Sequence, residues 1–168
     1  NFQVLHTWNP DIDLFNKSIK KTNEFKYLNR DNKNSRQSLY HPKLTRDNGL
    51  LFNSGPFRKI DACSNLIFKN VHDDFHHSIE TDLEGNIWVP SSMYPQSLPI
   101  RKVGVNPKSD FGYFDDAIVK LSPDGEVIFE KSVSQIFIDN GLEYLLFAMG
   151  SNNFELDPIH LNDIQPVD

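Results

Sequence analysis

The stretch that decides the fold is FHHSIETDLEGNIWV, residues 75–89. It places two adjacent histidines, His76 and His77, on an expected strand that leads through a tight turn into a second strand. This order of strand, glycine turn and strand is typical of one unit of a β-repeat. A partial copy, IHLNDIQPV at residues 159–167, again carries a histidine near its start. Histidines at equivalent points of a repeat predict one shared site.

Short apolar strands separated by glycine turns continue on both sides of this stretch. Turns are expected at Gly49, Gly85 and Gly125, and aligning Gly49 with Gly85 superimposes two copies of the pattern. The expected strands cover residues 50–52, 57–61, 66–69, 86–90, 115–122 and 126–131. An inexact repeat of four short strands is typical of β-propeller blades.

Insertions interrupt this repeat. Residues 13–43 are rich in Asn and Lys and predict a long insertion loop. Residues 91–114 contain several prolines and therefore cannot form a central strand. Residues 132–150 predict a short helix that is capped by Ser134 and stopped by Asn140-Gly141.

The predicted fold is all-β, an incomplete β-propeller of about two four-stranded blades plus flanking strands, with short helical and loop insertions. Residues 1–44 are expected to hold a trailing blade strand at residues 2–8 plus the insertion loop. Residues 45–168 are expected to hold two blades and the first strand of a third. Because propellers close into rings of roughly four to eight blades, we expect this chain to be a fragment whose partners include the missing blades of its parent.

Composition limits the class of partner. The net charge of −6, with acidic and basic residues intermixed, argues against nucleic acid, because phosphate binding needs a basic face. The 13 Phe residues can supply a core. No apolar run approaches the ~20 residues that span a bilayer, so no membrane segment is expected. Cys63 is the single cysteine and has no internal disulfide partner.

The histidine stretches predict where chemistry occurs. Side chains on a strand alternate between its faces, so only one of the two adjacent histidines can face a common centre. We favour His77 as the inward residue and keep His76 as the alternative. In the second copy, His160 and Asn162 share one face. A histidine there can act as nucleophile or proton carrier at neutral pH, and an Asn amide can donate to an anionic oxygen.

Two other interpretations of these stretches stay open. His72, Asp74 and His76 could fall on one face as a mixed nitrogen and oxygen ligand set. Their spacing matches no standard zinc motif, so no metal is expected. Alternatively, the polar side chains only satisfy backbone groups at a blade entrance, with His160 bonded to backbone and Asn162 capping a turn.

Three stretches together resemble the arylsulfotransferase family of β-propeller proteins: FHHSIETDLEGNIWV, DDAIVKLSPDGEVIFEKS with the following SQIFIDNGL, and DPIHLNDIQPV. The resemblance covers about residues 45–168. It implies a propeller of about six blades with its active site in the central channel. It also implies transfer of a sulfuryl group from a phenolic sulfate to a phenolic acceptor through a sulfated histidine, without a nucleotide sulfate donor or other cofactor.

The resemblance assigns roles residue by residue. His160 and Asn162 match the family's His-x-Asn strand entry, and His77, or His76, matches its earlier channel histidine. It therefore implies that His77 and His160 are catalytic and that Asn162 and His76 bind substrate. The family's sulfate-contacting arginine and nucleophilic histidine would both lie beyond Asp168, so this chain is expected to be inactive by itself.

The resemblance further implies a periplasmic or otherwise exported protein. The competing hypothesis is a catalytically silent β-propeller that binds a ligand or a protein partner through its channel mouth and long insertions.

Overall fold

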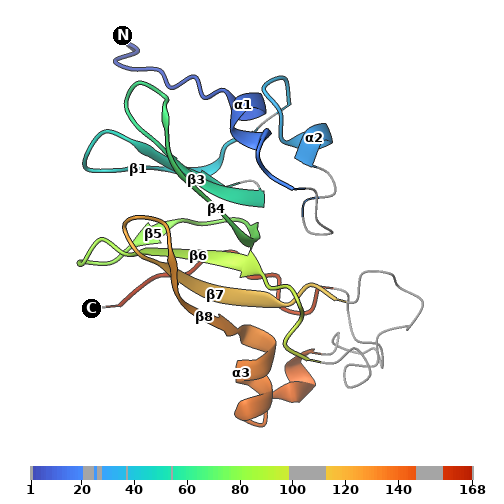
Figure 1. Ribbon diagram of the computed structural model, residues 1–168. Coiled ribbons are helices and arrows are strands. Elements are labelled where there is room, and N and C mark those ends of the chain that lie inside the picture. The colour runs from blue at the N-terminus through green and yellow to red at the C-terminus, as the bar shows by residue number, and fades with distance from the viewer. Residues whose placement is uncertain are drawn as a thin grey trace.

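The computed structural model describes residues 2–20, 25, 28–36, 38–53, 55–98, 113–146 and 157–167. Its strands form one antiparallel sheet of eight strands in the order β1-β2-β3-β4-β6-β7-β8, with β5 paired to β6 (Figure 1). The strands are β1 (Tyr40–Leu44), β2 (Leu50–Asn53), β3 (Gly55–Ile60), β4 (Leu66–Phe75), β5 (Glu80–Thr81), β6 (Ile87–Ser92), β7 (Asp116–Leu121) and β8 (Val127–Ser132). The helices are α1 (Ile12–Asn16), α2 (Leu28–Asp31), α3 (Val133–Asp139) and the 3-10 helix η1 (Glu143–Leu146).

The prediction of an all-β fold with short helical insertions is confirmed, and the sheet does not close on itself. None of the described helices combines the length and the apolar character needed to cross a membrane.

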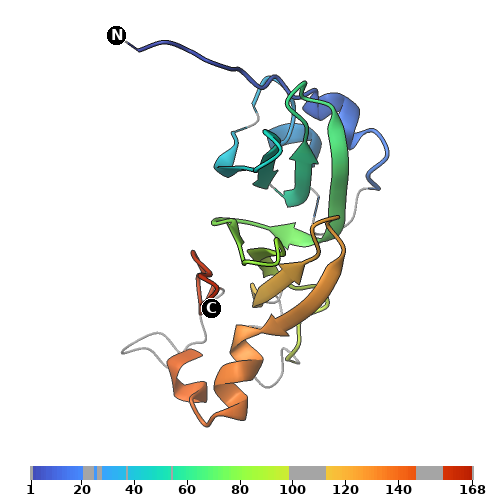
Figure 2. The same cartoon turned by 90° about the vertical axis from the view of Figure 1, so that its left-hand side faces the viewer.

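The sheet consists of two four-stranded meanders, which we call the first unit (β1 to β4) and the second unit (β5 to β8). Inside the second unit, β6 pairs with β7 through six residue pairs. Between the units, β4 and β6 share only two pairs, Asp74 with Ser92 and Phe75 with Ser91. Figure 2 shows β4 running from the first unit down to the second. Each unit therefore depends mainly on its own ladders.

Four turns in these units have the same backbone hydrogen bonds. The N–H of the first residue donates to the carbonyl of the fifth, and the N–H of the fourth donates to the carbonyl of the first. The turns begin at Thr45, Asp61, Asp82 and Ser122. The fourth residue always has a positive φ, of 61° at Asn48, 68° at Ser64, 84° at Gly85 and 87° at Gly125.

Asn48 is therefore the structural equivalent of Gly85, and the sequence alignment of Gly49 with Gly85 is wrong by one residue. Gly49 is required for a different reason, since a Cβ atom there would lie 2.5 Å from the carbonyl oxygen of Ile60. Both positions favour glycine, but for different reasons. Gly49 allows a close backbone approach, whereas Gly85 adopts a left-handed conformation.

The two units repeat position by position in their inner strands. Phe52 on β2 pairs with Arg58 on β3, and Val89 on β6 pairs with Val119 on β7 at the same distance from the turns. All four side chains are fully buried. The place that Val119 fills in the second unit is thus filled by a buried guanidinium in the first.

These four side chains mark the same face of the sheet in the two units. A different layer covers that face in each unit. In the second unit it packs against the opposite face of the first unit, in a core made of Leu51, Phe57, Phe75, Ile79, Ile87, Val89, Ala117, Val119 and Leu121. In the first unit it is covered by α1, in a core made of Ile12, Phe15, Leu50, Phe52 and Ile60. The units therefore stack face to face, and α1 caps the stack.

Two predicted strands are absent. Residues 2–8 form no strand and pair with none of the described strands, and Phe2 and Leu5 are exposed. The segment is instead attached by His6, whose Nε2 lies 2.8 Å from the carbonyl oxygen of Ala62. Residues 159–167 also form no strand. Isolated hydrogen bonds to other segments replace the expected ladder there.

The predicted helix is present but begins two residues earlier than expected. Ser132, rather than Ser134, caps α3 by accepting a hydrogen bond from the Gln135 N–H at 3.0 Å. Asn140 ends the helix as predicted, followed by Gly141 with a φ of 69°. Much of the Pro-rich insertion at residues 91–114 lies outside the described residues.

Candidate functional site

The two adjacent histidines lie in the connection between β4 and β5, not on a strand. β4 ends at Phe75, and His77 adopts a positive φ of 56°. Because strict alternation holds only along an extended strand, this bend lets both His76 and His77 line one cavity. The prediction that only one of them faces a common centre is therefore wrong.

The segment at residues 157–167 lies against this connection. The Ser78 N–H donates to the carbonyl oxygen of Asn162 at 3.2 Å, and the Ile164 N–H donates to Ser78 Oγ at 3.2 Å. These contacts bring the ring of His160 to 5.7 Å from the ring of His77, measured between centroids. Two histidine stretches that are far apart in the sequence thus meet in space.

A cavity of about 190 Å³ opens between these segments. The described residues that line it are mainly imidazoles and carboxylates: Asp74, His76, His77, Ser92, Phe114, Asp116, Asp157, His160 and Leu161. They come from the end of β4 and the connection that follows it, the end of β6, the start of β7 with the residues just before it, and the 157–167 segment. The cavity therefore lies where the two units meet.

His160 is oriented by Asp157. Its Nδ1 lies 2.5 Å from Asp157 Oδ2, and its backbone N–H donates to the other oxygen of the same carboxylate. This hydrogen bond, together with the negative charge, raises the pKa of His160 above its ordinary 6.5. The carboxylate thus favours the imidazolium and leaves Nε2 free of that contact.

His77 is shifted in the opposite direction. Burial lowers its pKa below the ordinary 6.5, and the neighbouring His76, His160 and His41 lower it further. His41, on β1, lies with its ring 6.4 Å from that of His77. His41 was not predicted as a site residue, because it is a lone histidine inside an expected insertion loop.

His76 contacts the buried carboxylate of Asp116, with Nε2 at 3.5 Å from Oδ1. The other oxygen of Asp116 accepts the Leu161 N–H at 2.6 Å. Among the described residues, the buried Nδ1 of His76 has no hydrogen-bond partner. The neighbouring Asp115 plays a different part, since it binds the hydroxyl of Ser132 at 2.6 Å.

Asn162 is not among the described residues that line the cavity. It is exposed, and its side-chain amide donates to the carbonyl oxygen of His160 at 3.0 Å. The expected common face of His160 and Asn162 does not form, because His160 has a positive φ of 50°. Its substrate-binding role stays a prediction.

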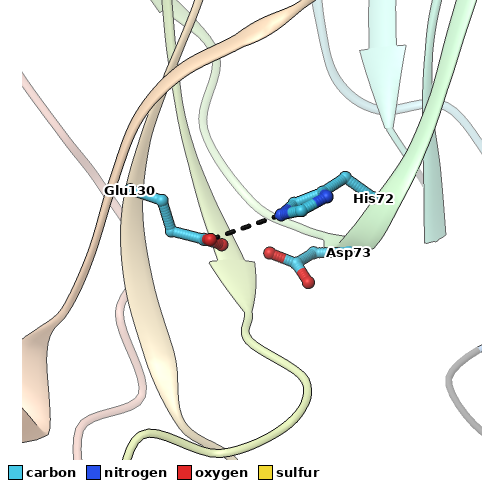
Figure 3. Close-up of side chains that lie close together, drawn as sticks. All are labelled: His72, Asp73 and Glu130. Atoms are coloured by element: carbon cyan, nitrogen blue, oxygen red, sulfur yellow. Dashed lines mark hydrogen bonds and ion pairs between the residues drawn. The ribbon is translucent and has the colours of Figure 1, made fainter.

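A second histidine and carboxylate group lies on the same stretch of β4, and Figure 3 shows it. His72 and Asp73 meet Glu130 of β8, and their ligand atoms all lie within 4.8 Å of one another. The metal-ligand set considered from the sequence, His72 with Asp74 and His76, is not brought together, since His76 lines the cavity instead. No signal in the sequence connects Glu130 to the histidines.

The cavity combines His77, whose pKa is lowered, with His160, whose pKa is raised. Such a divergent pair can accept a proton at one position and donate one at another. Imidazolium donors can also bind the oxygens of an anionic group. Because the three carboxylates of the wall carry negative charge, the binding of an anion depends on the protonation of the imidazoles.

A family model described as Arylsulfotransferase (ASST) matches residues 42–168, which contain the complete cavity wall described above. No curated protein matches the chain.

Proposed function

The chain belongs to the arylsulfotransferase family, and on this premise we propose that its protein transfers a sulfuryl group from a phenolic sulfate to a phenolic acceptor through a histidine intermediate. One observation carries the proposal: His76, His77 and His160 gather around one cavity inside the region that the family model matches. A phenolic sulfate would enter as the donor, and a phenol as the acceptor.

The reaction has two balanced steps. In the first, a histidine nitrogen attacks sulfur, the sulfur–oxygen bond to the donor breaks, and the phenolate leaves and takes up a proton. In the second, the acceptor oxygen attacks sulfur, the sulfur–nitrogen bond breaks, and the acceptor gives up its proton. Each step therefore needs one proton carrier close to sulfur.

The divergent histidines suit these two steps. His160, protonated beside Asp157, would give the proton to the leaving phenolate. His77, held neutral by burial, would take the proton of the acceptor phenol. His76, which lines the cavity, would bind sulfuryl oxygens, and Asn162 is proposed as a further donor to them. We place the nucleophilic histidine in another part of the protein, as the family resemblance implies.

We also propose that the two units are blades of a propeller. One support is the face-to-face packing of the two units. Another is that the face of the second unit that corresponds to Leu51 and Phe57 carries the half-buried Trp88 and the exposed Phe129. A further unit of the same kind would cover that face as the second unit covers the first. The cavity between the units would then open toward the propeller axis.

The experiment uses the protein in its full natural length. It is incubated with nitrophenyl sulfate as donor and phenol as acceptor, and the release of nitrophenol and the formation of phenyl sulfate are followed together. We expect both products in equal amounts, with a rate that depends on phenol. Nitrophenol without phenyl sulfate would identify a hydrolase and overturn the transfer step.

The competing class is a binding module without catalysis. It predicts no nitrophenol above the level of a heat-inactivated sample, together with saturable binding of nitrophenyl sulfate in a calorimetric titration. That pair of results would replace the enzyme proposal with the binding proposal.

A further inference from the structure

We propose that His72, Asp73 and Glu130 bind a divalent transition-metal ion, with Zn²⁺ as the best fit, and that the ion links the two units. The three side chains converge from β4 and β8 (Figure 3). This site is separate from the cavity, whose described lining contains none of the three residues.

The local backbone explains how adjacent residues can meet one partner. β3 and β4 pair at Phe57 with Asn70 and again at Gly55 with Phe75, so β4 has three more residues than β3 between these pairs. Such a bulge breaks the alternation of side chains. His72 and Asp73 can therefore both approach Glu130, although they are neighbours in the sequence.

The geometry suits a small ion. Zinc bonds of ~2.0–2.1 Å to nitrogen and oxygen place tetrahedral ligands roughly 3.3 Å apart. His72 Nε2 and Glu130 Oε2 are already 3.3 Å apart. All ligand atoms of the group lie within 4.8 Å, so the remaining adjustment is small.

The carboxylates of Asp73 and Glu130 also favour a bound cation. Asp73 is 1 % exposed, and from the described residues its oxygens accept long hydrogen bonds, of 3.3 Å from Ser91 Oγ and 3.4 Å from the Tyr94 N–H. Glu130 Oε1 is buried and has no partner among the described residues. Two such carboxylates need a shared proton or a bound cation.

The ligand types decide which cation. One imidazole with two carboxylates suits Zn²⁺ or Mn²⁺, whereas Ca²⁺ takes oxygen ligands only and usually six or more of them. Water would complete the zinc coordination. The ion would join β4 to β8, and this link would supplement the two residue pairs that connect β4 to β6. The sequence predicted no metal because Glu130 is far from the histidines along the chain.

The test is a calorimetric titration of chelator-treated full-length protein with Zn²⁺, and with Ca²⁺ in a parallel arm. We expect one high-affinity Zn²⁺ site per chain, weaker binding of Ca²⁺, and a rise of the thermal midpoint by several degrees on addition of Zn²⁺. Tighter binding of Ca²⁺ than of Zn²⁺ would overturn the assignment.

Variants locate the ion. His72→Ala and Glu130→Gln should each weaken Zn²⁺ binding at least about tenfold and remove the thermal shift. His6→Ala, which removes an exposed histidine elsewhere, should leave both unchanged. Glu130→Gln keeps the size of the side chain, so a folded variant is expected. Unchanged Zn²⁺ affinity in both site variants, or no Zn²⁺ binding by the wild type, would refute the proposal and leave a shared proton as the stabilising element.

Discussion

The first unit, β1 to β4, and the second unit, β5 to β8, share their turns and their cross-strand register but differ in what covers them. The second unit packs on the first through an entirely apolar core. The first unit is covered by α1, and under that helix Arg58 replaces the apolar residue. Its guanidinium donates to the carbonyl oxygen of Pro56 at 3.0 Å and to Asn16 Oδ1 at 2.6 Å.

This difference shows which parts of the repeat are constrained. Both units have the same turn backbone and the same buried positions on their inner strands. The type of side chain at a buried position depends on what covers it, which is α1 in the first unit and the first unit itself in the second. The chemical groups lie at the junction of the units. His77 follows the last strand of the first unit, His41 comes from its first strand, and His160 arrives from the 157–167 segment. The candidate site is therefore a product of the stacking, not of either unit alone.

The strongest test of this comparison exchanges the buried residues. Val119→Arg would bury a cation among apolar side chains and should cost at least about 4 kcal/mol of stability or prevent folding. Arg58→Val should cost less, about 2 kcal/mol, because it loses two hydrogen bonds and leaves a cavity but removes a buried charge. Urea unfolding measures both. Equal losses would show that the two coverings are equivalent.

The next test concerns the turns. Gly85 and Gly125 both have positive φ, but a Cβ atom at Gly125 would lie 2.5 Å from the ring of Phe68, whereas at Gly85 the nearest atom is Pro123 Cγ at 3.9 Å. We expect Gly125→Ala to cost about 3 kcal/mol and Gly85→Ala about 1 kcal/mol, measured by urea unfolding. A smaller loss at Gly125 would argue against the close approach of the two units.

A third variant should stabilise the protein. Asn48 is the counterpart of Gly85 and has a φ of 61°. Asn48→Gly should raise the free energy of unfolding by about 0.5 kcal/mol, because relief of the left-handed strain exceeds the added entropy of the unfolded chain. The thermal midpoint and the urea midpoint should both increase. A decrease in either would mean that the Asn48 side chain contributes more than its backbone strain costs.

The smallest effect concerns the contribution of the first unit to the site. Proximity to His41 is one of the causes that lower the pKa of His77. His41→Ala should therefore raise the pKa of His77, and the acidic limb of the activity profile should move to higher pH, because His77 then becomes protonated at higher pH. An NMR titration of the His77 ring measures this, with His6→Ala as the unchanged control. A pKa that stays constant or falls in His41→Ala would remove His41 from the site.

Much of this architecture could be predicted from the sequence, because strand alternation and turn residues are local signals. Local signals fail where the chain bends. The positive φ of His77 and of His160 broke the expected alternation, and the bulge in β4 moved His72 away from His76. Contacts between distant segments, such as that of Glu130 with His72, have no local signal at all.

We propose that the histidines of the cavity carry sulfuryl transfer. The most direct measurement compares the rate of phenol-dependent nitrophenol release by the full-length wild type and by His77→Ala, His160→Ala and His6→Ala. We predict a loss on the order of 100-fold or more for each cavity variant and a rate within about twofold of wild type for His6→Ala. Cavity variants that fold and retain the wild-type rate would show that these histidines are not needed for sulfuryl transfer.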